Sequence, residues 1–167
     1  MNEFDFLPPL RAPRKPVKPK PKMPEWCKDR YAAAHKLAFN KSAAESGHYF
    51  KPVMPDCNKS NGLTQSVIKF INYSGFYANR ISSTGRMIDS TKGKKVWIRG
   101  NTQRGTADIH ALVNSKHISI EIKIGADKMS EYQEKEKERI ENAGGLYWVV
   151  KTFEDFLQKY DSLFVPL

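Results

Sequence analysis

The chain has 167 residues, 40% of them hydrophobic and 28% charged, a composition typical of one globular domain with an appendage. It has no apolar run near the roughly 20 residues that cross a bilayer, no recognisable signal peptide and only two isolated cysteines, so we expect a cytosolic protein with neither a membrane partner nor a disulfide or zinc framework. The formal net charge of +10 favours a polyanionic partner such as DNA, although some basic proteins only bind nucleic acid weakly.

The N-terminal part of the chain has the composition of an extension. Residues 8–24 contain seven prolines among lysines and arginines, so residues 1–24 are expected to form a disordered tail, which could meet a protein partner. Strong helix formers over residues 25–44 predict a helix, and the turn residues of 46–62 predict a linker. We therefore divide the chain into the tail, a helical extension and linker over 25–60, and a compact domain over 61–167.

The compact domain begins with a predicted helix over residues 63–75, for which Thr64 is the candidate N-cap. A strand is expected over 76–84, a polar loop over 86–95 and a second short strand in "KVWIRG". Two stronger strands follow at 108–113 and 118–124, joined by a turn at "NSKH".

In the last part of the chain, the spacing of apolar residues changes from that of strands to that of helices. Ser130 can cap a helix over "EYQEKEKERIENA", "LYWVV" predicts a buried strand, and Thr152 can cap a final amphipathic helix. The expected order in the compact domain is a helix, four strands, a helix, a strand and a helix, so we expect an α/β (α+β) fold with a central mixed sheet flanked by helices.

Three charges lie in the hairpin strands, which otherwise suit a core. Side chains alternate between the two faces of a strand, so the isoleucines of "ISIEIKI" share one face while Glu121 and Lys123 share the other. Asp108 begins the partner strand, and in a hairpin it lies near the end of the second strand that carries Glu121 and Lys123. The three side chains can therefore converge.

This convergence suggests a metal site. Two adjacent carboxylates repel each other and persist in a half-buried sheet only with a compensating cation. Oxygen ligands favour Mg²⁺, or Mn²⁺, so we expect Asp108 and Glu121 to hold such an ion while Lys123 stabilises developing charge or positions the attacking water. The alternative is a salt bridge on a solvated face, worth under about 1 kcal/mol, and the spacing alone does not decide between them.

The motif "GTADI", followed after a hairpin by "EIK" and on the next helix by a glutamine, resembles the PD-(D/E)XK nuclease superfamily, in particular its VRR-NUC and Holliday-junction-resolvase-like branches. The resemblance covers roughly residues 63–160 and implies a restriction-endonuclease-like core with the order α-β-β-β-α-β-α. By position, Asp108 and Glu121 match the acidic metal ligands and Lys123 matches the catalytic lysine. The carbonyl of Ile122 matches the backbone metal ligand, and Gln133 matches a glutamine that orients the lysine or substrate.

Three positions qualify the resemblance. Gln133 also fits a capping box with Ser130, and the two roles are compatible. Ala107 stands before Asp108 where the superfamily motif often has proline. Members of these branches often carry an acid on the first helix, where the nearest residue here is Gln65. The sequence therefore does not decide whether the site holds one metal ion or two.

A basic segment precedes the hairpin and contains one acid, Asp89. Its basic residues are Arg86, Lys92, Lys94, Lys95, Arg99 and Arg104, and we expect them to bind phosphates. Among nearby aromatic residues, Tyr77 and Trp97 are the candidates for stacking on bases, while Tyr73 and Phe76 are expected in the core. His110 shares the face of Asp108, and for it we favour contact with nucleic acid or capping of the sheet over a general-base role.

Together these features predict a Mg²⁺-dependent DNA endonuclease that acts on branched, flapped or nicked DNA, since no major-groove recognition module is visible. Resolvase-like proteins commonly pair so that two sites cut two strands, which makes a homodimer a candidate state. The alternative is a basic nucleic-acid-binding or assembly protein on the same fold without catalysis. A restriction-type enzyme would need residues 1–60 as its recognition element, and their proline and lysine content argues against that.

Overall fold

The computed structural model describes residues 22–42, 49, 51–81, 85–89, 93–98 and 103–164. The helices are α1 (Glu25–Ser42), α2 (Ser60–Tyr73), α3 (Glu131–Asn142) and α4 (Phe153–Ser162). The strands are β1 (Tyr77–Arg80), β2 (Arg86–Asp89), β3 (Lys95–Ile98), β4 (Ile109–Val113), β5 (Lys116–Ile122) and β6 (Leu146–Val150). None of the described helices is long and apolar enough to cross a lipid bilayer. Most of the expected tail lies outside the described residues.

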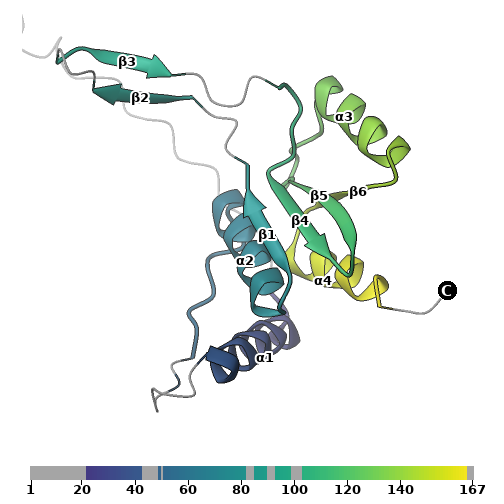
Figure 1. Cartoon of the computed structure of the whole chain (residues 1–167). Helices are drawn as coiled ribbons and strands as arrows, with labels where there is room; N and C mark the ends of the chain where they lie inside the picture. Colours follow the sequence, from purple (N-terminus) through teal and green to yellow (C-terminus); the bar gives the residue numbers. More distant parts are fainter. Residues whose placement is uncertain are drawn as a thin grey trace, which may run out of the picture.

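A four-stranded mixed sheet forms the centre of the fold, in the order β1-β4-β5-β6 (Figure 1). The first three strands are antiparallel neighbours, whereas β6 runs parallel to β5 after the crossover through α3. Helices α2 and α4 pack on one face of this sheet, and α1 packs against both of those helices. The expected mixed sheet flanked by helices is confirmed, and the elements around the sheet follow the order α2, β1, β4, β5, α3, β6, α4.

The two faces of the sheet differ in chemistry. Ile118, Ile120 and Ile122 are buried in the core together with apolar residues of α2 and α4, as the alternation of the strand indicated. The opposite face carries Glu121 and Lys123 and is covered by α3, which has no buried residue of its own. This polar face is therefore closed by a polar helix rather than by a second apolar layer.

A tight hairpin fixes the register of β4 and β5. Asn114 and Ser115 have φ angles of 49° and 62°, which is the left-handed conformation that a two-residue hairpin turn with the twist of the strands requires. The turn is shorter than expected, because Lys116 and His117 already belong to β5. The resulting register pairs Ile109 with Ile120.

The predicted helix caps are partly confirmed. The side chains of Ser130 and Thr152 accept hydrogen bonds from backbone N–H groups in the first turns of α3 and α4. The expected cap at Thr64 is wrong, because α2 begins at Ser60 and the Thr64 hydroxyl donates to the Ser60 carbonyl at 2.8 Å. A threonine inside a helix can bond to the carbonyl one turn back, so residue type alone did not identify the end of α2.

The polar loop expected over residues 86–95 is wrong in its first half, which forms β2. This strand pairs with β3, so the strand expected in "KVWIRG" is confirmed over its first four residues, and it belongs to a separate two-stranded sheet. The ribbon of β2 and β3 stands away from the four-stranded sheet in Figure 1. The segment "RMID" has little local strand signal between turn residues, and its conformation depends on a partner strand nine residues further along the chain.

Candidate active site

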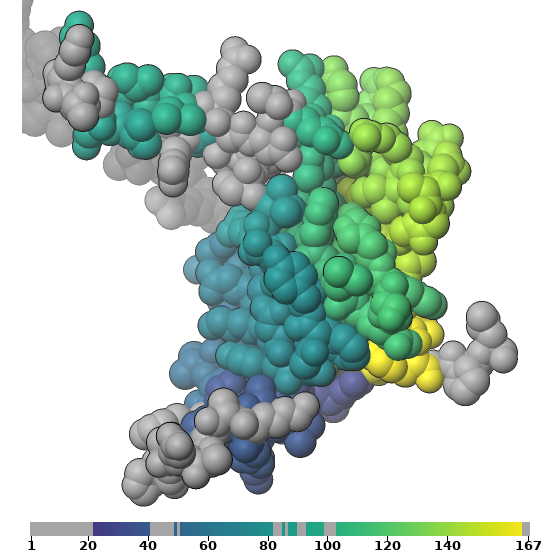
Figure 2. Space-filling model, viewed as in Figure 1, coloured from purple at the N-terminus to yellow at the C-terminus, as the bar shows by residue number. Residues whose placement is uncertain are grey.

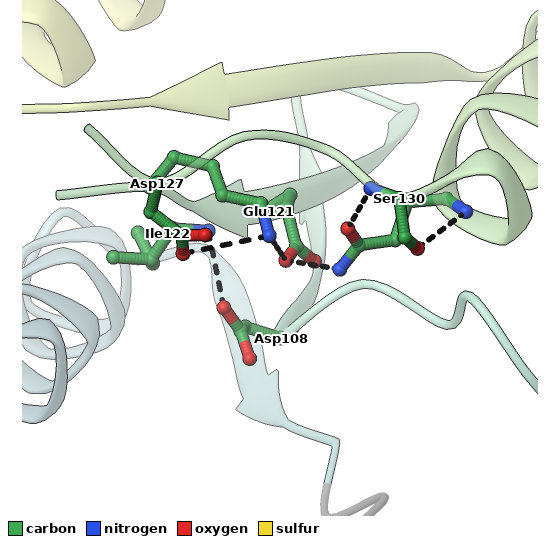
Figure 3. A network of polar contacts seen from close by, with 7 residues as sticks. Asp108, Glu121, Ile122, Asp127 and Ser130 are labelled. Atoms are coloured by element: carbon green, nitrogen blue, oxygen red, sulfur yellow. Dashed lines mark hydrogen bonds and ion pairs between the residues drawn. The ribbon is translucent and has the colours of Figure 1, made fainter.

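The predicted site residues meet at the C-terminal end of β5, under the first turn of α3. Asp108 immediately precedes β4, Glu121 and Ile122 end β5, and Lys123 follows directly. Gln133 lies in the first turn of α3, above the same face of the sheet. Figure 3 shows Asp108, Glu121 and Ile122 gathered in one polar network.

Asp108 is held against the backbone of β5. Its side chain is half-buried, and Oδ2 accepts a hydrogen bond from the Ile122 N–H at 3.1 Å (Figure 3). Its backbone carbonyl accepts from the Ile81 N–H at 2.8 Å, just beyond β1. The N–H and C=O of one strand residue point to the same side, so the Ile122 carbonyl also faces Asp108. The structure thus brings together the three groups that the resemblance implied as metal ligands.

Glu121 is almost completely buried, with 3% of its surface exposed. Its Oε1 accepts a hydrogen bond from Gln133 Nε2 at 2.5 Å and lies 3.1 Å from Lys123 Nζ. Its Oε2 is also buried but has no hydrogen-bond partner among the described residues. Both donors therefore converge on one oxygen of the carboxylate and leave the other available.

Burial raises the pKa of Glu121 above its ordinary value of 4.5, and the negative charge of Asp108 raises it further. The hydrogen bond and charge of Lys123 lower the same pKa but do not outweigh those two effects. Two ionised carboxylates at this position are therefore only partly compensated by the protein, and a cation would favour the charged state of both.

Lys123 is buried as well, at 7% exposure. The salt bridge with Glu121 that was considered as the alternative is therefore present, but it lies on a buried face rather than on a solvated one. The Lys123 ammonium also lies 3.6 Å from Oδ2 of the exposed Asp127. Sequence reasoning missed Asp127, although its position four residues after Lys123 and just beyond the strand was a usable signal. Asp127 partly neutralises the lysine on the side away from Glu121.

Gln133 forms the capping box considered for it and also contacts a site residue. Its backbone N–H and side chain complete the capping box with Ser130, and its Nε2 at the same time reaches Glu121. The contact differs from the one implied, because Gln133 orients the carboxylate rather than Lys123. Gln65 is exposed on α2 and takes no part in the hydrogen bonds that join the described site residues.

The basic residues expected to bind phosphates are only partly described. Lys94 and Lys95 are exposed on the ribbon. The side chain of Arg86 and the whole of Lys92 and Arg99 lie outside the described residues.

Arg104 is fixed beside the site. Its guanidinium lies over the Tyr132 ring at 5.2 Å and donates to the Tyr132 hydroxyl at 3.0 Å. Gly105 makes this approach possible, since it has φ +83° and a methyl group there would lie 2.2 Å from the Tyr132 carbonyl oxygen. The segment leading to Asp108 is thus anchored on α3.

A second polar group lies further along the same face. The rings of His110 and His117 meet edge to face at 5.2 Å, and burial, followed by the charge of His117, lowers the pKa of His110. Ser119 Oγ and the Tyr147 hydroxyl are buried and lack partners among the described residues. Sequence reasoning missed Tyr147, because its place opposite Ser119 depends on the parallel pairing of β6.

The donor set near Asp108 suits a hard divalent ion. No group of three or more His, Cys, Asp or Glu side chains that could hold a metal occurs in the part of the chain described. Two carboxylates and one backbone carbonyl are nevertheless oxygen donors of the kind Mg²⁺ takes, with water completing its shell. The unpaired Glu121 Oε2 and the raised pKa of Glu121 are consistent with such an ion. The residues present therefore fit Mg²⁺ or Mn²⁺ held by Asp108, Glu121 and the Ile122 carbonyl.

Comparison of the chain with protein-family models and with curated proteins found no match.

Proposed function

We propose that this protein is a Mg²⁺-dependent endonuclease that hydrolyses DNA phosphodiester bonds on a restriction-endonuclease-like core. The observation that carries the proposal is the arrangement around Glu121, where Gln133 and Lys123 both occupy Oε1 and Oε2 stays buried without a partner on the face that Asp108 shares. A purely structural ion pair between Glu121 and Lys123 needs no second carboxylate, and the negative charge of Asp108 acts against the ionised state of Glu121 by raising its pKa.

The chain's own residues have distinct roles in this proposal. Asp108, Glu121 and the Ile122 carbonyl would hold the ion, which when bound polarises the scissile phosphate and acidifies a water molecule. Gln133 keeps the Glu121 carboxylate in one orientation. Lys123 places a buried ammonium beside the ligands, where it can stabilise the charge that develops on the phosphate.

DNA with a branch, a flap or a nick is the proposed substrate. The net charge of +10 and the exposed Lys94, Lys95 and Arg104 suit a phosphate backbone, and these contacts carry no sequence information. The same charge is equally consistent with the competing proposal, a basic DNA-binding or assembly protein without catalysis. The competing proposal does not explain why Glu121 and Lys123 are buried next to Asp108.

The test is incubation of end-labelled duplex, flap and four-way-junction DNA with the full chain in Mg²⁺, Mn²⁺ or chelator. Asp108→Ala and Lys123→Ala are the site variants, and Glu138→Gln on the exposed face of α3 is the matched control. DNA binding is measured in parallel in chelator, because both site variants should still bind.

We expect metal-dependent cutting by the wild type and by Glu138→Gln, and a loss of at least roughly a hundredfold in both site variants. Equal cutting by the wild type and Asp108→Ala would overturn the nuclease proposal. Equal binding with no cutting by any form would favour the non-catalytic alternative.

A further inference from the structure

The ribbon of β2 and β3 has an unusual surface. The two strands pair with each other and make no extensive contact with any other described helix or strand. Figure 2 shows the ribbon in teal, standing out from the body of the molecule. Its exposed large apolar residues are Met87, Ile88, Val96, Trp97 and Ile98. A two-stranded ribbon is marginally stable alone in water, and an exposed apolar patch of this kind marks a binding surface.

Trp97 is the most exposed of these apolar side chains, at 57%, and it faces Met87 across the strands. Gly85 lies directly against its indole, because a methyl group on Gly85 would lie 2.6 Å from the ring atoms Cε2 and Cζ2. The glycine therefore lets the ring rest on the backbone while much of its surface remains open. An indole held in this way is prepared for stacking on a flat ligand.

The charge of this region identifies the class of ligand. Between Gly85 and Arg104 the only acid is Asp89, which is paired in register with Lys95, and six basic residues accompany it. A second copy of the chain would bring the same positive charge to the contact, since the whole chain carries +10. A polyanion with flat, stackable groups is complementary on both counts, and DNA has both features.

The ribbon lies within reach of the candidate active site. The Ile81 N–H donates to the Asp108 carbonyl at 2.8 Å, and four residues along the chain lead from Ile81 to Gly85, against which Trp97 packs. Because an extended residue spans at most about 3.5 Å, the nearest atoms of the Trp97 ring lie no more than about 25 Å from Asp108. This distance corresponds to about seven nucleotides of one DNA strand at roughly 3.4 Å each.

We propose that the ribbon is a DNA-binding arm whose Trp97 indole stacks on an unpaired base within about seven nucleotides of the cleavage site, so that DNA with unpaired bases is preferred over continuous duplex. Bases inside a duplex are already stacked on their neighbours, whereas a flap or branch exposes a face to the indole. The position of the cut relative to Trp97 rests on the proposed function, but the binding preference does not.

The test measures binding of the full chain to a labelled flap and to a duplex of equal length, by fluorescence anisotropy in chelator so that no cutting occurs. Trp97→Ala should weaken flap binding by roughly tenfold, because a stacked base commonly contributes this much, and should weaken duplex binding less than about threefold. Trp97→Phe should keep most of the flap affinity. Trp26→Ala, on the exposed side of α1, is the matched control and should change neither affinity.

A double variant separates charge from stacking. Lys94→Ala combined with Lys95→Ala should weaken flap and duplex binding alike and reduce the slope of log affinity against log salt by roughly two. Unchanged flap affinity in Trp97→Ala would overturn the arm proposal. So would a wild-type dimer that Trp97→Ala dissociates in the absence of DNA, since the ribbon would then be a protein interface.

The two proposals fail separately. A preference for unpaired bases that depends on Trp97, in a protein that never cuts DNA, would reject the nuclease and keep the arm. Metal-dependent cutting with equal flap affinity in the wild type and Trp97→Ala would do the reverse.

Discussion

Replacing Asp108 by asparagine should make the metal-free protein more stable. The asparagine oxygen can still accept from the Ile122 N–H, whereas the charge that raises the pKa of Glu121 is removed. Two like unit charges repel by about 4 kcal/mol at a separation of about 4 Å and an effective dielectric constant of about 20, and the energy falls in inverse proportion to their distance. Lys123, 3.1 Å from Glu121, and the partial exposure of Asp108 reduce this effect. We therefore expect a net gain on the order of 1 kcal/mol, or about 2–4 °C in Tm.

The assay is thermal unfolding of the wild type and Asp108→Asn in chelator and in Mg²⁺. An ion at ten times its Kd should stabilise the wild type by about 1.4 kcal/mol and leave the variant unchanged. The difference between the two melting temperatures should therefore shrink or change sign. The advantage of Asp108→Asn in chelator should be present above the raised pKa of Glu121 and disappear as the pH falls through it, because protonation of Glu121 relieves the repulsion in the wild type.

Glu138→Gln removes an acid outside the site and is the control. Its melting temperature should equal that of the wild type under every condition. An Asp108→Asn protein that is less stable than the wild type in chelator would show that the two carboxylates do not repel. An Asp108→Asn protein whose melting temperature rises as much in Mg²⁺ as that of the wild type would show that Asp108 is not a ligand.

The contacts around Glu121 and the anchored loop give the remaining predictions. Ser130→Ala should lower the free energy of unfolding by about 1 kcal/mol and leave the cutting rate unchanged. Gln133→Leu should lower the free energy of unfolding too, and it should also cut at least about tenfold more slowly in single-turnover assays, because the Gln133 side chain contacts Glu121 and the Ser130 side chain does not. Lys123→Met should move the midpoint of Mn²⁺ binding to higher pH, since Lys123 lowers the pKa of Glu121, and spectroscopic Mn²⁺ titrations with an unchanged midpoint would contradict this. Gly105→Ala should destabilise by about 1–3 kcal/mol in urea unfolding, because its φ is +83° and a methyl group there would meet a backbone carbonyl of α3.

Patterns within single segments allowed much of the fold to be predicted. The alternation of the 118–124 strand correctly separated the buried isoleucines from Glu121 and Lys123, because one sheet face packs on apolar helices. Tyr77 and Trp97 are exposed while Tyr73 and Phe76 pack against the core, as expected.

Features that depend on distant pairing could not be predicted. The strand β2 needs β3 as a partner, and the segment "RMID" has no strong strand pattern of its own. The place of Tyr147 on the polar face follows from the parallel register of β6, which the sequence pattern does not specify. The convergence of Gln133 and Lys123 on one Glu121 oxygen depends on how α3 is placed over the sheet. Sequence reasoning thus found the charged residues of the site but not the contacts that give each oxygen its role.

The most direct test of the site compares the cutting of one labelled flap substrate by the wild type and by Glu121→Gln, at saturating DNA and in Mg²⁺. The glutamine keeps the shape of the side chain and removes the charge that the ion requires. We expect both proteins to bind the flap equally and the variant to cut at least roughly a hundredfold more slowly. Equal cutting by the two proteins would contradict the central claim that Glu121 holds a catalytic metal ion.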